Sequence, residues 1–373
     1  MKKIFSLVCM VAMTLSFMAC SDDDDTGAAY TRTSTISVVK SDVLFSAKAG
    51  TGSVTVKANG PLEVIDTCSW CKVAATSDST VSVSVDLNDD KLGRSSLLTI
   101  KSGIDSVNVT IQQEGFVFQT DMGTVAAFGD EATEKSYAMT CNGDPQITST
   151  EDWLTVTTRN DSLIVSATEN NSGTIRKGYI KFTYGELKDS VLVNQYDFDK
   201  DIAGNYYFAF YTNKGQLSYF ASQFLKNSGE YSLSFPALGF SLPVSFDEKN
   251  CKVSFTAGSY MGDWVEDGTT YYVYSVLGSS GAGKITYSTS VSMAASFYCE
   301  EGFTMADFED TGSWNYVADY LALYLFTKKA PSSANRVGLL INMYSPFLQK
   351  MDDSDASAKL HSFAAPSRLS ILK

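Results

Sequence analysis

The feature that most constrains the fold of this chain is an internal duplication of a unit of about 80 residues. Asn59-Gly60 recurs as Asn142-Gly143 and Trp70 recurs as Trp153, in both cases 83 residues later. Four more pairs recur after 82 residues: Asn88 and Asn170, Arg94 and Arg176, Gly103 and Gly185, and Gln113 and Gln195. Because the spacings from arginine to glycine and from glycine to glutamine are the same in both copies, we expect two copies of one structural unit.

Each copy contains short runs in which apolar and polar residues alternate, a pattern typical of strands with one buried face. The alternating apolar positions include Val81, Val83 and Val85 in the first copy, and Leu163, Val165 and Ala167 in the second. Gly103 and Gly185 lie where a hairpin turn would need a positive φ angle. The pattern and the size of the unit predict two antiparallel, Ig-like β-sandwiches.

The repeated residues resemble those of the BACON domain, whose name stands for Bacteroidetes-associated carbohydrate-binding often N-terminal. The first copy carries Ser69-Trp70, Lys72-Val73, Asn88, Arg94-Ser95 and Ile111-Gln112-Gln113. The second carries Asp152-Trp153-Leu154-Thr155-Val156, Asn170, Arg176-Lys177-Gly178 and Val193-Asn194-Gln195. The resemblance covers roughly residues 35 to 198 and divides them into domains 35–116 and 117–198. It implies Ig-like sandwiches in surface proteins of gut Bacteroidota, near glycan-handling modules, where such domains can act as spacers.

Two kinds of marker residue have a structural as well as a functional interpretation. Trp70 and Trp153 lie beside alternating apolar residues, which favours core packing over a sugar-stacking platform, although either role is open. Arg94 and Arg176 begin strands, where an arginine can tie a turn to a carboxylate or a carbonyl group. We therefore expect the arginines to be structural.

The N-terminus predicts an exported lipoprotein. Residues 1–19 have a basic start and an uncharged core, as in a signal peptide, and they end before Cys20 in a sequence that resembles a lipobox. Lipid on Cys20 would anchor the chain, with residues 20–34 as an acidic tether. The run Asp22–Asp25 resembles the export signal of surface lipoproteins, so we expect an outer-membrane protein that faces the cell exterior. No other segment is apolar for long enough to cross a membrane.

Charge and cysteine usage exclude several classes of function. Without Lys2 and Lys3, the chain has 27 basic and 42 acidic residues and so a strong net negative charge. Such a charge repels phosphate backbones, so we do not expect nucleic acid as a partner. Five cysteines follow Cys20 and cannot pair completely, so no disulfide scaffold is expected. Cys68 and Cys71 have the spacing of a redox motif, but their flanks predict strand and turn instead of a helix N-terminus. No second close pair suggests a zinc site.

Composition changes near residue 200, which predicts a third domain over residues 199–350. Of the 46 Phe, Trp and Tyr residues, 31 follow Asp199. The expected strands include Tyr231–Phe235, Lys252–Phe255, Thr270–Val276, Lys284–Thr289, Val291–Tyr298, Tyr316–Phe326 and Arg336–Tyr344, and would form a β-barrel or a β-sandwich. Gln216–Lys226 has helical spacing of its apolar residues and predicts a short helix. Residues 351–373 form a polar tail.

The candidate ligand-binding residues are aromatic residues beside a carboxylate or an amide. They fall in two turn-like segments and one strand, and they are Tyr260, Asp263 and Trp264, then Trp314 and Tyr316, then Tyr272. Sugars stack their C–H face on aromatic rings, while carboxylates and amides bond their hydroxyl groups. The structural alternative is that both tryptophans plug the end of a barrel.

We expect no enzymatic activity, no cofactor and no metal. The chain has one histidine, His361 in the polar tail, and no phosphate-binding loop or dinucleotide fingerprint. Three hypotheses remain. The first is a surface protein that binds host mucin or dietary polysaccharide, with the two repeats acting mainly as spacers. The second is a structural or adhesive protein that binds protein partners. The third is a barrel that holds a small apolar ligand.

Overall fold

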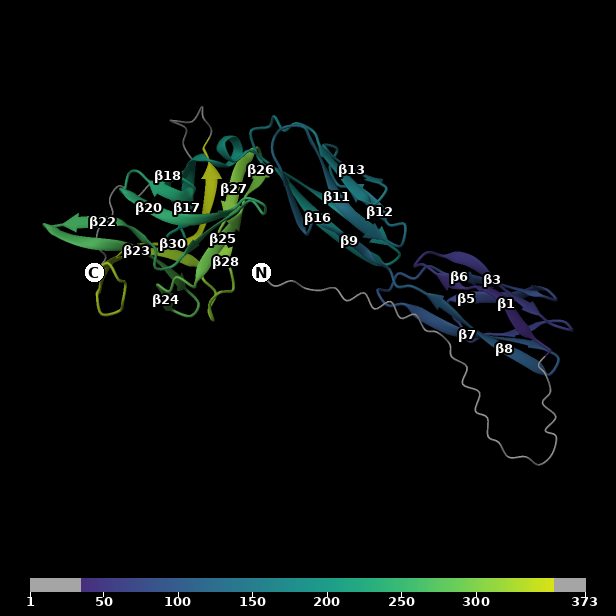
Figure 1. Ribbon diagram of the computed structural model, residues 1–373. Coiled ribbons are helices and arrows are strands. Elements are labelled where there is room, and N and C mark those ends of the chain that lie inside the picture. The colour runs from purple at the N-terminus through teal and green to yellow at the C-terminus, as the bar shows by residue number, and fades with distance from the viewer. Residues whose placement is uncertain (1–34, 352–373) are drawn as a thin grey trace.

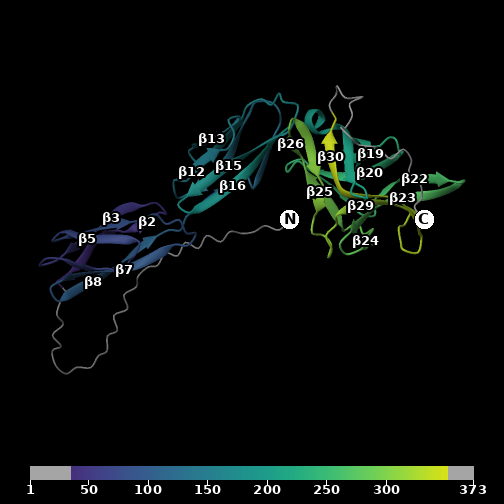
Figure 2. The same ribbon diagram turned by 180° about the vertical axis from the view of Figure 1, so that it is seen from behind.

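The computed structural model describes residues 35–351, which form three β domains in a row (Figure 1). The two repeats follow one another, and the larger third domain lies at the far end from the first (Figure 2). The signal peptide, Cys20, the acidic tether and the polar tail from residue 352 lie outside the described residues. Within residues 35–351, no helix has the length and apolar composition that a membrane crossing requires.

The first repeat is a sandwich of two four-stranded sheets. One sheet has the order β1-β3-β6-β5 and the other β2-β8-β7-β4. The strands are β1 (Ser37–Asp42), β2 (Leu44–Phe45), β3 (Gly50–Lys57), β4 (Glu63–Ile65), β5 (Cys71–Ser77), β6 (Thr80–Val85), β7 (Arg94–Ser102) and β8 (Asp105–Gln113). Val81, Val83 and Val85 are buried between the sheets, as their alternation predicts. Cys68 and Cys71 form a disulfide beside this core.

The second repeat has the same topology, with sheets β9-β11-β14-β13 and β10-β16-β15-β12. Its strands are β9 (Phe118–Thr120), β10 (Val125–Phe128), β11 (Thr133–Cys141), β12 (Gln146–Ser149), β13 (Leu154–Arg159), β14 (Ser162–Ala167), β15 (Arg176–Tyr184) and β16 (Leu187–Gln195). Even the parallel pairing of β2 with β8 recurs, as β10 with β16. The prediction of two Ig-like sandwiches is confirmed.

The two sandwiches meet through a joint made by the loops at their facing ends. Gly103 and Gly185 have φ angles of 60° and 56° in the predicted hairpin turns. The amide of Glu186, next to Gly185, donates to the Asp89 carboxylate of the first sandwich at 2.8 Å. A Cβ on Gly185 would lie 2.2 Å from this carboxylate, whereas a Cβ on Gly103 would meet nothing within 4 Å.

Eight strands of the third domain curl into a barrel. They are β17 (Gly204–Tyr211), β18 (Leu217–Asn227), β19 (Glu230–Phe235), β20 (Phe240–Asp247), β21 (Lys252–Thr256), β25 (Ser292–Ser296), the strand made of β27 (Phe303–Asp307) with β28 (Glu309–Asp310), and β30 (Arg336–Lys350). β28 pairs with β25 and β27 pairs with β30, which also pairs with β17. Alternate residues of each strand point inward and fill the barrel. The fully buried aromatic residues are Tyr206, Phe208, Phe210, Phe224, Phe255 and Phe297.

A second layer, called here the side sheet, extends from the barrel through the N-terminal half of β30. It has the order β22-β23-β29-β30, with β24 paired to β23. Its other strands are β22 (Tyr260–Glu266), β23 (Thr269–Ser279), β24 (Lys284–Thr286) and β29 (Tyr320–Phe326), while β26 (Tyr298–Glu300) pairs with β27. One face of the side sheet packs on the barrel core through residues such as Val273, Leu277 and Leu323. Its other face points away.

The expected helix at Gln216–Lys226 is wrong, because all of these residues except Gln216 belong to strand β18. Ser218, Phe220, Ser222 and Phe224 are all buried, which is the two-residue period of a strand. The apolar positions fit both periods, and pairing with β17 and β19 decides between them. The one helix among residues 35–351 is a five-residue π-helix, η1 (Phe198–Ile202), at the entrance to the barrel.

The second sandwich and the barrel are joined by a buried contact. Ile175 of the sandwich packs into the barrel core, and Asn194 donates to the Lys249 carbonyl at 3.0 Å. Lys200 of η1 forms an ion pair with Asp130 at 2.9 Å. Asp201 is fully buried here, and one of its carboxylate oxygens has no partner.

The two equivalent glycine turns, of which only the Gly185 turn contacts the other sandwich, give a matched test of the first joint. Alanine at either Gly185 or Gly103 should cost its sandwich roughly 1 kcal/mol, because the left-handed backbone disfavours a Cβ. Only Gly185→Ala should also displace Asp89 and loosen the joint. Small-angle X-ray scattering should show a broader distance distribution for Gly185→Ala than for Gly103→Ala. Identical scattering profiles would contradict this account of the joint.

The buried Asp201 makes the stability of the second joint depend on pH. Burial, with the nearby Asp130 carboxylate, raises the pKa of Asp201 to about 6. An unfolded aspartate titrates near ~3.9, so the folded chain gains a stabilising proton as pH falls from about 6 toward ~4. Above pH 6 the ionised carboxylate lowers stability.

We therefore expect Asp201→Asn to raise the free energy of unfolding at pH 7.5 by roughly 1–3 kcal/mol and to flatten its dependence between pH 4 and 6. Chemical unfolding at a series of pH values measures both effects. Asp199→Asn, at an exposed position in the same helix, is the control and should change neither. A less stable Asp201→Asn protein at pH 7.5 would contradict the prediction.

Candidate functional site

The outer face of the side sheet carries a cluster of tyrosines, called here the tyrosine face. Its members are Tyr260, Tyr272, Tyr274, Tyr287, Tyr320, Tyr324 and Tyr344. They come from β22, from β23, from the segment after β24, from β29 and from β30, so their common face depends on strand pairing. Tyr274 and Tyr320 are buried, and Tyr260 is 38% exposed. The others are half-buried, so part of each of these side chains is open to solvent.

A β-bulge brings two of the predicted site residues onto this face. Tyr260 and Asp263 are three residues apart, and in a regular strand they would point to opposite faces. The register of β22 shifts between Tyr260 and Gly262, so that Tyr260 lies opposite Tyr274 and Asp263 lies opposite Tyr272. The Tyr260 hydroxyl donates to the Asp263 carboxylate at 2.6 Å.

Polar groups surround the tyrosine rings. The Lys329 amine lies 5.3 Å from the ring centres of both Tyr260 and Tyr272, and the Arg336 guanidinium lies 5.3 Å from that of Tyr324. Asn342 is paired with Ala322, which packs on the same face, and its buried side-chain oxygen has no hydrogen-bond partner. These groups supply donors and acceptors beside aromatic planes.

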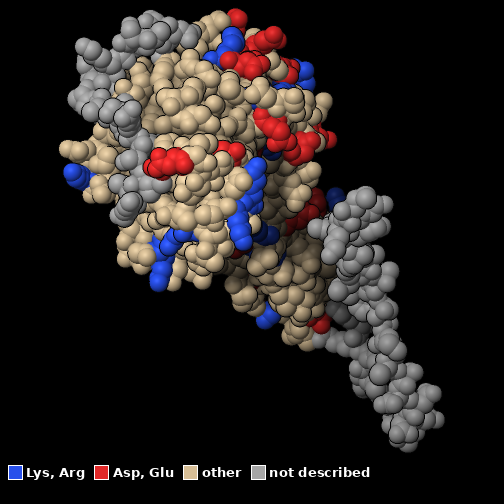
Figure 3. Space-filling view, turned by 90° about the vertical axis from the view of Figure 1, so that its left-hand side faces the viewer, with Lys and Arg blue, Asp and Glu red and all other residues tan. Residues whose placement is uncertain are grey.

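Three hydroxyl groups of the tyrosine face, those of Tyr260, Tyr274 and Tyr320, stay protonated at neutral pH. The hydrogen bond to Asp263 raises the pKa of Tyr260 to about 12, because ionisation would place a second negative charge beside the carboxylate. Burial raises the pKa of Tyr320 to about 12 and also raises that of Tyr274. The face therefore offers neutral hydroxyl groups to a ligand. Figure 3 views the molecule from the side that carries the β22–β23 hairpin, and most of the visible surface there is uncharged.

The two predicted tryptophans lie elsewhere. Trp264 is on the opposite face of β22 from Asp263 and packs, half-buried, against the barrel core, with its ring centre 6.3 Å from that of Phe240. Trp314 also packs against that core, and its ring centre is 5.0 Å from that of the exposed Tyr316. The structure thus brings together Tyr260, Asp263 and Tyr272, and it places the Trp314–Tyr316 pair in a separate loop.

The tryptophans of the two repeats take part in one repeated structural network. The Arg94 guanidinium lies 4.5 Å from the ring centre of the half-buried Trp70, and its Nε donates to the Gln113 side chain at 2.9 Å. Its Nη2 also donates to the Asp86 and Leu87 carbonyls. The guanidinium thus occupies one face of the Trp70 ring, where a sugar would otherwise stack.

The second repeat has the same network. Arg176 lies 4.5 Å from the ring centre of Trp153, and its Nε donates to Gln195 at 2.8 Å. A hollow of about 640 Å³ beside Trp153 is bounded by Asn171 and Ser172 and by Tyr298 of the third domain. No group of three or more side chains that could ligate a metal occurs within residues 35–351.

Most of the tyrosine face was not predicted from the sequence. Tyr272 and Tyr274 are two residues apart in one strand, and Tyr320 and Tyr324 are four apart in another. An even spacing places both members of each pair on the same face of their strand, and this signal is visible in the sequence. That these strands are neighbours follows only from the pairing of β23 with β29. The contributions of Lys329 and Asn342 have no signal in the sequence that we can identify.

Comparison with known proteins identifies the repeats. Residues 63–114 and 144–196 match the family BACON, described as "Putative binding domain, N-terminal". The chain therefore carries two tandem BACON domains. No curated protein is similar enough in sequence to count as a match.

Several solved structures are similar over part of the chain. A chimeric titin Z1Z2 is 8% identical over 44% of this chain and 98% of its own, with a TM-score of 0.27. The endo-fucoidan hydrolase MfFcnA4 is 16% identical over 46% of this chain and 30% of its own, with a TM-score of 0.22. A Bacteroides ovatus GH5 xyloglucanase in complex with a XXXG heptasaccharide is 17% identical over 26% of each chain, with a TM-score of 0.19.

The network predicts that the BACON arginines stabilise the fold. Arg176→Ala should lower the free energy of unfolding by roughly 3 kcal/mol, because it removes charge-assisted hydrogen bonds and the stack on Trp153. Arg176→Lys should not restore it, since an ammonium group lacks the planar fork of donors. Urea unfolding followed by tryptophan fluorescence measures the change, with the exposed Arg159→Ala as control. Equal stability of Arg176→Ala and Arg159→Ala would contradict a structural role.

Proposed function

We propose that this chain is a lipid-anchored surface protein that binds a glycan, host mucin or dietary polysaccharide, on the tyrosine face of its third domain. The observation that carries the proposal is the gathering of Tyr260, Tyr272 and Tyr274 beside Asp263 and Lys329 on one open side of a sheet. Aromatic planes can stack on the C–H face of a sugar, and the carboxylate and amine can bond its hydroxyl groups.

The arrangement of the domains supports a role at the cell surface. Lipid on Cys20 would hold the N-terminus to the outer membrane, facing the exterior. In sequence the two BACON domains lie between Cys20 and the third domain, and in the structure they form a row with that domain (Figure 1). As spacers they would hold the tyrosine face away from the membrane, where a polymer too large to diffuse through the envelope is accessible.

One observation favours a second candidate function. The tyrosine face is the surface of a sheet, and a broad aromatic surface of this kind also suits a protein partner. Adhesion to a protein is therefore the alternative. A small apolar ligand inside the barrel has no such support, because buried aromatic side chains fill the interior.

Affinity gel electrophoresis tests the proposal. Purified residues 27–373 should be retarded in gels that contain a mucin or a plant polysaccharide. Tyr272→Ala and Tyr260→Ala should weaken binding about tenfold each, which corresponds to the loss of one aromatic stacking contact. The matched control is Tyr179→Ala, which removes a similarly exposed tyrosine from the second BACON domain.

The remaining outcomes separate the alternatives. Loss of retardation in Trp314→Ala alone would move the site to the loop of Trp314 and Tyr316. Retardation that survives every one of these substitutions would contradict a site on the tyrosine face. No retardation on any matrix would favour the adhesive alternative.

A further inference from the structure

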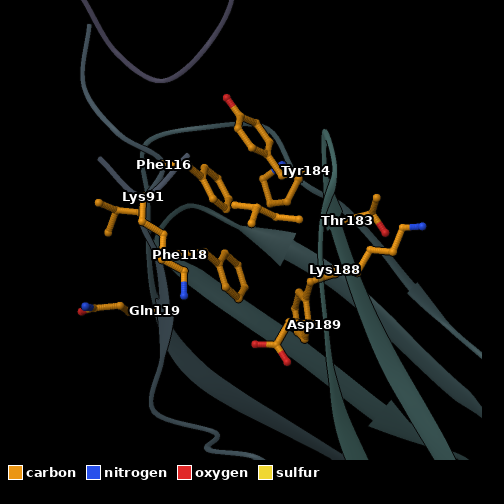
Figure 4. Close-up of a pocket in the computed structure, with 12 residues that line it drawn as sticks. Lys91, Phe116, Phe118, Gln119, Thr183, Tyr184, Lys188 and Asp189 are labelled. Atoms are coloured by element: carbon orange, nitrogen blue, oxygen red, sulfur yellow. The ribbon is translucent and has the colours of Figure 1, made fainter. Parts of the chain in front are cut away.

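A pocket of about 440 Å³ lies at the joint between the two BACON domains (Figure 4). This volume is in the range of small-molecule binding sites. Its apolar walls include Phe116 of the interdomain linker and Phe118, Phe182 and Tyr184 of the second sandwich. The first sandwich contributes Lys91. The pocket therefore belongs mainly to the second domain and the linker, and the first domain closes one side of it with Lys91.

The aromatic walls are specific to the second repeat. The hairpin of β15 and β16 pairs Phe182 with Asp189 and Tyr184 with Leu187. The matching hairpin of β7 and β8 pairs Ile100 with Val107 and Ser102 with Asp105. The same fold is therefore built in the first repeat without aromatic residues at these positions. The sandwich itself does not require them, so another function must explain them.

Part of this aromatic set holds the joint rigid. Phe116 stacks on Tyr184 with a centroid distance of 3.9 Å and an interplanar angle of 10°. Gly143 lies against both rings, because a Cβ there would come within 2.8 Å of each. Phe118 is not part of this stack. It lies 4.7 Å from Phe182, and its ring is only half-buried.

The joint also fixes the position of Lys91. The Phe116 amide donates to the carbonyl of Asp90, the residue before Lys91, at 2.8 Å. On the other side of this loop, Asp89 accepts from the Glu186 amide. The two halves of the pocket are therefore held together before any ligand binds, which lowers the entropic cost of binding.

The polar groups of the pocket lie around the Phe118 ring. In Figure 4 the Lys91 amine and the Asp189 carboxylate both lie near this ring, whereas the Lys188 amine points away. The Lys91 amine has no hydrogen-bond or ion-pair partner among residues 35–351. In the part of the chain that the structure describes, the Asp189 carboxylate accepts a hydrogen bond only from the amide of Ser190, at 2.7 Å. One positive and one negative group thus border an open phenyl ring.

We propose that this pocket binds one or two units of an uncharged saccharide, stacked on Phe118 and hydrogen-bonded by Lys91 and Asp189. A sugar has an apolar C–H face and a rim of hydroxyl groups that can both donate and accept hydrogen bonds. That pattern matches a phenyl wall bordered by a donor and an acceptor. The opposite charges cancel, so the pocket has no preference for an anion. The site lies in different domains from the tyrosine face and does not depend on it.

Saturation-transfer NMR on residues 27–373 tests the proposal with lactose, cellobiose and xylobiose as probes. We expect at least one of these disaccharides to bind, and Lys91→Ala and Asp189→Ala each to weaken it at least about fivefold, since each removes a charge-assisted hydrogen bond. Both side chains are exposed, so the substitutions should leave the fold intact. Lys188→Ala, in the same pocket but pointing away, should bind as the unsubstituted chain does.

Two further measurements separate this site from the tyrosine face. Tyr272→Ala should leave the pocket's affinity unchanged, and Lys91→Ala should leave gel retardation by a polysaccharide unchanged if that depends on the tyrosine face. Binding of none of the three disaccharides would overturn the pocket proposal, as would binding that Lys91→Ala and Asp189→Ala do not affect. Binding of an aromatic probe such as benzyl alcohol in place of every sugar would also overturn it.

Discussion

The stacking of an arginine on a tryptophan, repeated in both BACON domains, is the interaction on which the arrangement of the molecule depends. Arg94 and Arg176 also bond the carbonyl groups at the start of a loop, residues 86–93 in the first domain and 168–175 in the second. These are the loops that contact the next domain, through Asp89 in one case and Ile175 in the other. The residues that mark the family thus fix the loops from which both joints are built.

The proposed binding surface of the third domain lies outside its barrel. The interior of the barrel is filled by buried aromatic side chains, whose removal from water stabilises the barrel, whereas wider barrels enclose ligand cavities. The side sheet has the opposite character, because its outer tyrosines are only partly covered. The bulge at Met261 and Gly262 shifts the register of β22, so that Tyr260 and Asp263 lie on the same face as Tyr272.

The sequence was informative where periodicity and repetition act locally. The two sandwiches, their glycine turns and most strands of the third domain follow from alternation. Tyr260 and Asp263 were placed in one short segment, whereas their meeting with Tyr272 on one face was not predicted. The helix expected at Gln216–Lys226 failed because Phe220 and Phe224 suit both periods and the pairing partners of the strand lie outside any local window. The inward direction of Trp264 and the meeting of Tyr272 with Tyr324 on one face depend in the same way on long-range pairing.

Each sandwich pairs an early strand in parallel with its last strand, β2 with β8 and β10 with β16. When the ends of such a pair are pulled apart, the force runs along both strands, and the hydrogen bonds between them are loaded together instead of one after another. The connection of β16 to η1 and the barrel is direct, so tension applied at the third domain reaches this pair. Tension along the row would therefore load the hydrogen bonds between β10 and β16 together, so that they would not open one by one.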